Sequence, residues 1–215
     1  MASGSGRRSS RAAAAGAASA ANIQRRRSFL IGYEGQRLGS DCLTIKEVPF
    51  CPAGISSSSH DGEGVAKHDL TLLDAGVLTT FLHNSYTAHK AGVPNNAHAV
   101  RGGYSGAVGI GVSNIFVTPG DRPEAELIAE VENGLYINYA GLAPDQASGE
   151  VSATIDFGFR IINGECAYPV KTAMVGSDVF EMLGAIDAVS SDYREEPGMI
   201  IPSLRLRDIQ VAGGG

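Results

Sequence analysis

The clearest pattern along the chain is a two-residue alternation of apolar and polar side chains in VSATIDFGFRII, residues 151–162. Successive side chains of a strand point to opposite faces, so one face would carry Val151, Ala153, Ile155, Phe157, Phe159 and Ile161. Asn163-Gly164 follows, a pair that permits positive φ at both central positions of a type I′ turn, and ECAYPVKTAMV returns the chain. The pattern predicts an antiparallel hairpin.

Shorter apolar runs predict further strands. Leu43 and Ile45 lie at alternate positions between polar residues, and SNIFV forms a run at residues 113–117. SLRLRDIQV predicts a last strand near the end of the chain. LTLLDAGVLTTFL contains two runs around Asp74-Ala75-Gly76, which is a hairpin signal.

Two segments have helical spacing instead. The first helix is expected in GDRPEAELIAEVENG, with Asp121 as its cap and Gly134 at its end. Pro123 suits its first turn and Glu124 completes a capping box. The second helix would begin after Ser177 and carry an apolar stripe of Val179, Met182, Leu183 and Ile186. Few helices and many hairpin-linked strands predict an α+β fold dominated by antiparallel sheet.

The bulk composition fits one main domain. A chain of 215 residues can bury a sizeable core, and 28 glycines, about twice the usual share, favour a strand-rich fold over a helical bundle. The cysteines Cys42, Cys51 and Cys166 are odd in number and lack CxxC spacing, so they indicate neither a disulfide framework nor a zinc site. They suit a reducing cytoplasm. No apolar run is long enough to predict a membrane span.

Charge separates residues 1–27 from the rest. This segment holds six arginines and no acidic residue, so the remaining chain carries −12 when the whole carries −6. An acidic body argues against a nucleic-acid groove, because duplex binding depends on neutralising phosphates. We expect residues 1–27 to be a disordered, low-complexity tail or a targeting segment, and residues 28–215 to form the folded domain.

The glycine-rich stretch RGGYSGAVGIG, residues 101–111, does not predict a nucleotide site. GAVGIG has the wrong glycine order for a dinucleotide fingerprint, the strand SNIFV follows where a helix would be needed, and a P-loop lysine is absent. Glycine permits the close approach of another backbone instead. That backbone could belong to the fold itself or to a bound peptide.

Candidate chemistry is sparse. The five histidines His60, His68, His83, His89 and His98 lack the i, i+4 spacing of helical metal ligands, so ordinary solvated histidines are the expectation. Asp61 and Glu63 in HDGEG are either turn formers or a pair of functional carboxylates. No Gly-x-Ser-x-Gly elbow or cysteine nucleophile signature is present. We therefore assign no catalytic and no metal-ligating residue.

Several stretches taken in order resemble one family. They are RRRSFLIGYEGQRLGSDCLTI, DGEG, LLDAGVLTTFLHNSYTAHKAG, NNAHAVRGG, SNIFVTPGDRPEAELIAEVENGLYI, IINGECAYPVKTAMVGSDVFEMLGAI and PSLRLRDIQVAG. The set resembles the C-terminal part of the TldD/PmbA family, also called modulators of DNA gyrase. The resemblance implies a sheet-rich, barrel-like domain that follows an N-terminal α/β domain in a cytoplasmic metalloprotease of two related subunits.

The resemblance also implies which branch is involved. In the active subunit a helix bearing HExxxH precedes the segment that resembles RRRSFL, and a cysteine near the C-terminus adds a zinc ligand. Here residues 11–16 are RAAAAG, and DYREEPGMIIP at residues 192–202 has no cysteine. Both departures match the PmbA branch, also called TldE. The family's N-terminal domain is missing as well, so the chain resembles a fragment, a split gene product or a mis-started reading frame.

The leading hypothesis is a non-catalytic PmbA/TldE-like subunit of a zinc-dependent peptidase complex that handles unfolded or modified peptides. Zinc would lie in a TldD-like partner, with self-association as the other mode of assembly. We expect SNIFV and the glycine-rich loop to offer edge backbone to a peptide. The residues for peptide contact or for a structural motif are Asp61, Glu63, Arg101, Gly109, Gly111 and Asn114.

Two other hypotheses remain. One is a nucleic-acid-associated, gyrase-modulator-like regulator that binds through the arginine-rich tail. The other is an active hydrolase with an unrecognised site.

Overall fold

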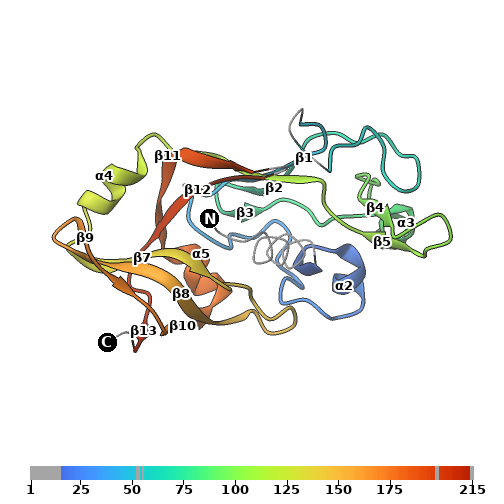
Figure 1. Cartoon of the computed structure of the whole chain (residues 1–215). Coiled ribbons are helices and arrows are strands. Elements are labelled where there is room, and N and C mark those ends of the chain that lie inside the picture. Colours follow the sequence, from blue (N-terminus) through green and yellow to red (C-terminus); the bar gives the residue numbers. More distant parts are fainter. Residues whose placement is uncertain (1–15, 52–53, 55, 197–198, 214–215) are drawn as a thin grey trace.

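The computed structural model describes residues 16–51, 54, 56–196 and 199–213. In this part of the chain strands outnumber helices and mostly pair antiparallel, which confirms the α+β class (Figure 1). The strands form two large sheets and a separate two-stranded ribbon. None of the described helices is both long and apolar enough to cross a membrane.

The first sheet has six strands, and only its β12–β6 pair is parallel. In order across the sheet they are β11 (Ile186–Glu196), β12 (Met199–Leu206), β6 (Asn114–Val117), β1 (Ile45–Val48), β2 (Leu70–Asp74) and β3 (Val77–Leu78). The predicted strand SNIFV is therefore β6, in the interior of the sheet. The main hydrophobic core includes Leu73 and Leu78 from this sheet together with Leu43 and Leu82.

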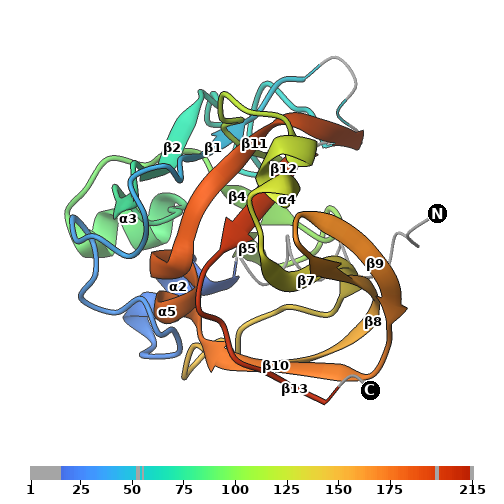
Figure 2. The same ribbon diagram turned by 90° about the vertical axis from the view of Figure 1, so that its left-hand side faces the viewer.

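The second sheet curls around its own small core but does not close into a barrel (Figure 2). Its strands are β13 (Val211–Ala212), β10 (Ala173–Asp178), β8 (Glu150–Ile162), β7 (Asn133–Ala140) and β9 (Glu165–Val170), which pairs with β8. Val151, Ala153, Ile155 and Ile161 are buried as the alternation predicts. Phe157 is 39% exposed, although it packs edge-on against Phe159, so the buried face is interrupted there.

Both predicted tight turns are confirmed. Asn163 and Gly164 have φ of 49° and 80° between β8 and β9. Ala75 and Gly76 have φ of 44° and 78° between β2 and β3. Positive φ at two successive residues matches the right-handed twist of the strands that such a turn joins.

The two predicted helices exist, but their ends differ from the prediction. For α4 (Glu124–Ala129), Pro123 rather than Asp121 occupies the cap position, and the Glu124 N–H donates to Asp192 Oδ1 at 2.7 Å. The capping group thus comes from β11, far away in sequence. The helix ends at Ala129 with Glu130 as its C-cap, and Gly134, which was predicted to end it, belongs to β7.

The other helices are α5, α3 and α2. α5 (Val179–Ala185) is capped by Asp178 and not by Ser177, because Asp178 Oδ1 accepts the Phe180 N–H at 2.7 Å. α3 (Ser85–Ala91) begins in a capping box between Asn84 and Thr87. α2 (Ala20–Gln24) lies in the segment that was expected to be disordered.

Residues 16–27 belong to the folded domain, so the expected tail boundary at residue 27 is wrong. Ala17, Ala18 and Ala20 are buried in the main core. The Ala20 N–H donates to Leu82 O at 3.0 Å, and the Leu82 N–H donates to Ala18 O at 2.9 Å. Small alanine side chains let two backbones approach this closely, which composition alone does not reveal. Residues 1–15 lie outside the described residues.

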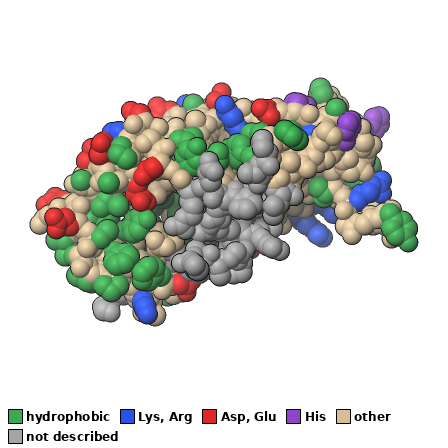
Figure 3. All heavy atoms as spheres, turned by 45° about the horizontal axis from the view of Figure 1, so that its top comes forward, with side chains coloured by type: hydrophobic (Ala, Val, Ile, Leu, Met, Phe, Trp, Pro, Cys, Tyr) green, Lys and Arg blue, Asp and Glu red, His purple; other side chains and the backbone are tan. Residues whose placement is uncertain are grey.

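The β4–β5 ribbon, formed by β4 (Ala99–Arg101) and β5 (Val108–Ile110), lies beside α3 at the end of the molecule opposite the curled sheet (Figure 1). Tyr104 in its turn is fully exposed. Figure 3 shows acidic side chains toward the α4 end of the molecule, and histidine and basic side chains toward the ribbon end. The acidic charge of the body is therefore unevenly spread.

Gly76 and Gly92 provide a matched test of backbone crowding. Both have left-handed φ, of 78° and 71°. A Cβ on Gly76 would lie 2.2 Å from Gly39 O, whereas a Cβ on Gly92 would meet nothing within 4 Å. We predict that Gly92→Ala costs about 1 kcal/mol of unfolding free energy, from strain alone. Gly76→Ala should cost about 3 kcal/mol or more because overpacking adds to the strain. Urea unfolding measures both, and equal losses would contradict the prediction.

Candidate functional site

Asp61 fixes the loop that precedes β2 onto the β4–β5 ribbon. Its Oδ1 accepts the N–H groups of Glu63 and Val65, each at 2.9 Å, and its Oδ2 accepts the Ala99 N–H at 3.1 Å. The Gly62 N–H in turn donates to Ala99 O at 2.7 Å. This carboxylate is used by backbone donors, as expected for a turn former.

Glu63 supports the beginning of α3. Its Oε2 accepts the Ser85 N–H at 2.9 Å, and Asn84 Oδ1 accepts the Thr87 N–H at 2.9 Å. Both contacts satisfy amides that a helix start leaves without partners. Asp61 and Glu63 are thus close in the fold, but they hold backbone and do not form an acid–base pair.

Arg101 braces the ribbon. Its Nε donates to Gly62 O at 2.9 Å and its Nη1 donates to Gly106 O at 3.3 Å. One side chain therefore ties β4 to the Asp61 loop and to the ribbon turn.

The outer edge of β5 has no strand beside it in the described part of the chain. Ala99 directs its N–H and C=O to the Asp61 loop, so Ala99 and Ile110 form a pair without mutual hydrogen bonds. The same holds two residues along, for Arg101 and Val108. Val108 and Ile110 consequently direct their N–H and C=O groups away from β4. This is the arrangement that accepts an added strand.

The glycines in and beside the ribbon differ in how much space a Cβ atom would have. A Cβ on Gly109 would make ordinary contact with Val100 Cγ2 at 3.6 Å, while a Cβ on Gly111 would lie only 2.9 Å from Val100 Cγ1. The closest backbone approach is at Gly62, where a Cβ would lie 3.1 Å from Ala99 O. Close approach within the fold therefore explains Gly62 and Gly111, whereas Gly109 is exposed.

The peptide contact that was expected of Asn114 and β6 is not possible in this fold. Asn114 is completely buried, and its Nδ2 donates to Val48 O at 2.8 Å. β6 pairs with β1 on one side and with β12 on the other, so it offers no free edge. The expectation that SNIFV supplies edge backbone is wrong, because the parallel β12 covers it. Of the two segments, the ribbon is the one with an edge that pairs with no strand in the described part of the chain.

A buried polar cluster links the ribbon to the first sheet. Glu47 on β1 and His98 next to β4 are each 1% exposed, and Glu47 Oε2 lies 3.7 Å from His98 Nε2. Glu47 Oε1 accepts the Ser113 N–H at 2.7 Å, and Lys67 Nζ donates to Ser113 Oγ. Burial raises the pKa of Glu47, but His98, the Ser113 N–H and the Lys67 charge outweigh it and hold that pKa below its ordinary value.

The hydrogen bonds of Asn96 decide where His98 carries a proton. Asn96 Nδ2 donates to Phe81 O at 2.8 Å, and Asn96 Oδ1 accepts the His83 N–H at 2.7 Å, so the orientation of the amide is fixed. His98 Nδ1, 3.0 Å from the same Oδ1, must therefore donate. His98 Nε2 faces the Glu47 carboxylate, with 3.7 Å between Nε2 and Oε2.

The histidines are divided between surface and interior. His60, His68 and His89 are exposed, as expected, but His83 and His98 are buried, so the expectation of solvated side chains is wrong for these two. Among the described residues, no three His, Cys, Asp or Glu side chains converge as a metal site requires.

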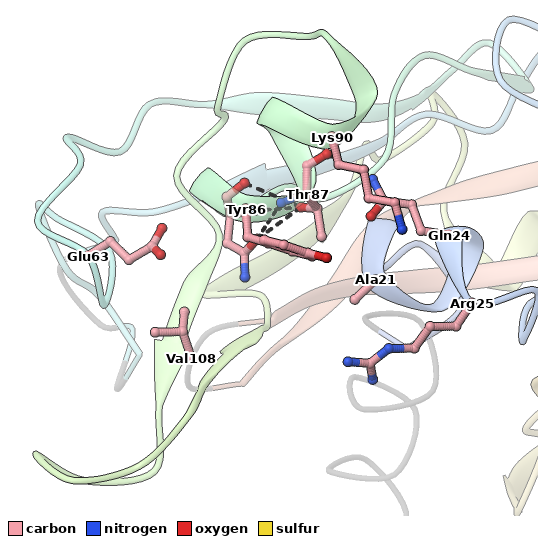
Figure 4. Close-up of a pocket in the computed structure, with 9 residues that line it drawn as sticks. Ala21, Gln24, Arg25, Glu63, Tyr86, Thr87, Lys90 and Val108 are labelled. Atoms are coloured by element: carbon pink, nitrogen blue, oxygen red, sulfur yellow. Dashed lines mark hydrogen bonds between the residues drawn. The ribbon is translucent and has the colours of Figure 1, made fainter.

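A cavity of about 330 Å³ lies between α2, α3 and the first residue of β5 (Figure 4). Arg25 and Lys90 line it, and no contact between either of these side chains and a described polar group is a hydrogen bond or an ion pair. Glu63 lies on the opposite side of the cavity, and the Tyr86 ring lies between (Figure 4). This volume is near the lower limit of known small-ligand sites.

Sequence reasoning missed Glu47, Lys67 and the cavity. A signal for Glu47 was present, because Leu43, Ile45 and Glu47 alternate and should share a face. A glutamate in line with buried apolar positions predicts a buried carboxylate with a cationic partner. No comparable signal joins Arg25 to Lys90, because only the fold brings their helices together.

The sequence of the chain matches a known family over nearly its whole length. Residues 9–213 match the model of the PmbA/TldA metallopeptidase C-terminal domain. The chain belongs to this family. It is 34% identical over 199 residues to a metalloprotease of Methanothermobacter thermautotrophicus, covering 86% of this chain and 43% of the relative. It is 27% identical to the metalloprotease PmbA of Escherichia coli, covering 92% of this chain and 42% of that protein.

Solved structures agree with this assignment. A Thermotoga maritima protein, described as a candidate modulator of a DNA gyrase, superposes with a TM-score of 0.83 at 32% identity. The match covers 91% of this chain and 45% of that protein. The chain thus spans less than half the length of these relatives, in the part that corresponds to the PmbA/TldA C-terminal domain.

The buried Glu47 should be a major contributor to stability. Glu47→Ala removes an acceptor of the buried Ser113 N–H and the carboxylate that faces His98 Nε2. We predict a loss of about 3 kcal/mol in the free energy of unfolding, measured with urea. Lys46→Ala, on the exposed face of the same strand, is the control and should change it by less than about 0.5 kcal/mol. Similar effects of the two variants would contradict a structural role for the buried Glu47 carboxylate.

His83 should make stability depend on pH. Burial holds the pKa of His83 below its ordinary 6.5, so the unfolded chain binds the proton more readily. The stabilisation is present above pH 6.5 and is lost as the pH falls from there toward the folded pKa. We predict that His83→Asn flattens the change in urea midpoint between about pH 7.5 and 5.5, whereas exposed His89→Asn leaves it intact. An unchanged slope in His83→Asn would refute this assignment.

Proposed function

We propose that this chain acts in the cytoplasm as the C-terminal part of a non-catalytic PmbA/TldE-like subunit. In this proposal the subunit works with a TldD-like partner that carries the catalytic zinc, or with a second copy of itself. The complex handles unfolded or modified peptides, which reach it as extended chains.

The observation that carries the proposal is the open outer edge of β5. Val108 and Ile110 direct backbone N–H and C=O groups outward, while the opposite edge of the ribbon is occupied by the Asp61 loop. An extended peptide can add to such an edge through main-chain hydrogen bonds, which place little demand on its sequence. That suits a substrate defined by being unfolded.

The state of the acidic and histidine side chains supports a non-catalytic role. Asp61 and Glu63 hold backbone amides, and Glu47 is paired with buried His98. In the full sequence no histidine is followed by glutamate, so the HExxxH pattern of the active subunit does not occur in it. A zinc peptidase needs a metal-polarised water beside a free carboxylate base. The partner would supply both.

The nucleic-acid alternative has less support. Residues 28–215 carry a formal charge of −12, which opposes the close approach of phosphates. Part of the arginine-rich segment is folded against the core. The description as a gyrase modulator applies to the related proteins that carry this name.

Mixing the chain with a TldD-type subunit tests the proposal. We predict that the mixture cleaves an unfolded reporter peptide several-fold faster than the TldD-type subunit alone, and that the chain alone does not cleave it. Ile110→Pro removes one outward N–H donor of β5 without removing a hydrogen bond to β4, and should abolish the gain. Ile110→Val keeps the donor and is the matched control.

Two results would overturn the proposal. The first is chelator-sensitive cleavage by the chain alone. The second is a full gain in activity with a folded Ile110→Pro variant, because the β5 edge would then play no part. Circular dichroism and urea unfolding establish that the variant is folded.

A further inference from the structure

The cavity between α2 and α3 adjoins the open edge of β5. Val108, the first residue of β5, is part of its lining, together with Ala21 and Arg25 of the α2 segment and Tyr86 and Lys90 of α3. Figure 4 shows Val108 below the Tyr86 ring, Lys90 on α3 in the upper part of the view and Arg25 below α2. A strand added to β5 would therefore have one of its ends at this cavity.

Several polar groups of the cavity wall are already used. Gln24 Nε2 donates to Thr87 O at 2.8 Å, and Thr87 and Asn84 bond each other in the capping box. Glu63 Oε2 accepts the Ser85 N–H. The charged groups that remain for a ligand are the Arg25 guanidinium and the Lys90 ammonium. The cavity therefore offers one cation from α3, one cation from the end of α2 and one partly used carboxylate from the Asp61 loop.

The direction of an added strand decides which end of a peptide reaches the cavity. β5 runs from Val108 to Ile110, so a peptide added antiparallel runs from the Ile110 end to the Val108 end. Its C-terminus then lies at Val108, beside Arg25 and Lys90. A parallel peptide would bring its N-terminal ammonium to the same two cations, which repel it. Antiparallel pairing is also slightly the more stable of the two modes.

We propose that this cavity binds the C-terminal carboxylate of an extended peptide that adds antiparallel to β5, with Arg25 and Lys90 as the anion-binding groups. The proposal rests on the proposed function, because it assumes that a peptide occupies the β5 edge. The ligand class is thus a peptide with a free C-terminus, such as a protein end or a cleavage fragment. The Tyr86 ring, which is 69% exposed, offers a surface for its last side chain.

The expected gain in affinity is modest. Arg25 and Lys90 are both exposed, so their attraction for a carboxylate is screened by solvent and salt. Charge-assisted hydrogen bonds from the planar guanidinium would strengthen it. We expect a free carboxylate to bind about fivefold more tightly than the uncharged amide, corresponding to about 1 kcal/mol. The difference should shrink as the salt concentration rises.

The test uses the full chain and two labelled peptides that differ only at the C-terminus. Both are N-acetylated with alternating threonine and valine, and one ends in a free carboxylate while the other ends in a carboxamide. Fluorescence anisotropy gives their affinities for wild-type protein, for Arg25→Gln/Lys90→Gln and for the control Arg27→Gln, which is exposed but outside the cavity lining. We expect a ratio of about five for wild type and for the control, and a ratio near one for the double variant.

The outcomes separate this inference from the proposed function. Equal binding of both peptides by wild type, with loss of binding in Ile110→Pro, overturns the carboxylate site and retains the β5 edge. A ratio that persists in the double variant assigns the preference to other residues and also overturns the site. Failure of wild type to bind either peptide overturns the carboxylate site and counts against the proposed function as well.

Discussion

The buried contact between Glu47 and His98 is the constraint on which the arrangement of the ribbon depends. Glu47 belongs to the first sheet, and His98 directly precedes β4. Both side chains are 1% exposed, and a buried polar group is costly unless polar partners face it. The pair therefore fixes where the ribbon joins the sheet. Hydrophobic contacts alone would allow this junction to slide, because they have no preferred direction.

The same cluster holds the loop that closes the inner side of the ribbon. Lys67 donates to Ser113, whose N–H is bonded to Glu47, and the strand bridge between His60 and Ala66 lies in the loop that leads to Lys67. Within that loop, Asp61 bonds Ala99 and so occupies the inner edge of β4. A chain of polar contacts thus runs from β1 to β4. Because these contacts cover β4, the outer edge of the ribbon among the described residues is that of β5.

Local features of the fold could be predicted from the sequence, and long-range ones could not. Period-two alternation predicted β8, and the pairs Asn163-Gly164 and Ala75-Gly76 predicted their turns, because these signals lie within a few residues. The predicted cap of α4 was wrong because the capping carboxylate belongs to Asp192, which lies on another element. The prediction of disorder was wrong for the N-terminal alanines because their contact with Leu82 is a tertiary one. At the site, turn chemistry predicted that Asp61 would bind backbone N–H groups. The contacts of Arg101 with Gly62 and Gly106 and the partner strand of β6 could not be predicted, because the fold creates them.

The composition of the ribbon bears on how selective its edge can be. In a strand added to β5, side chains on one face would lie beside Gly109, which presents no side chain of its own to pair with them. The opposite face is set by Ile110, which packs partly against the main core and cannot adapt to a ligand. Beside Gly109 and Ile110, neither face therefore forms a pocket for a particular side chain. Discrimination among extended peptides then falls to their ends, where the charge of the chain terminus differs from that of every internal peptide unit.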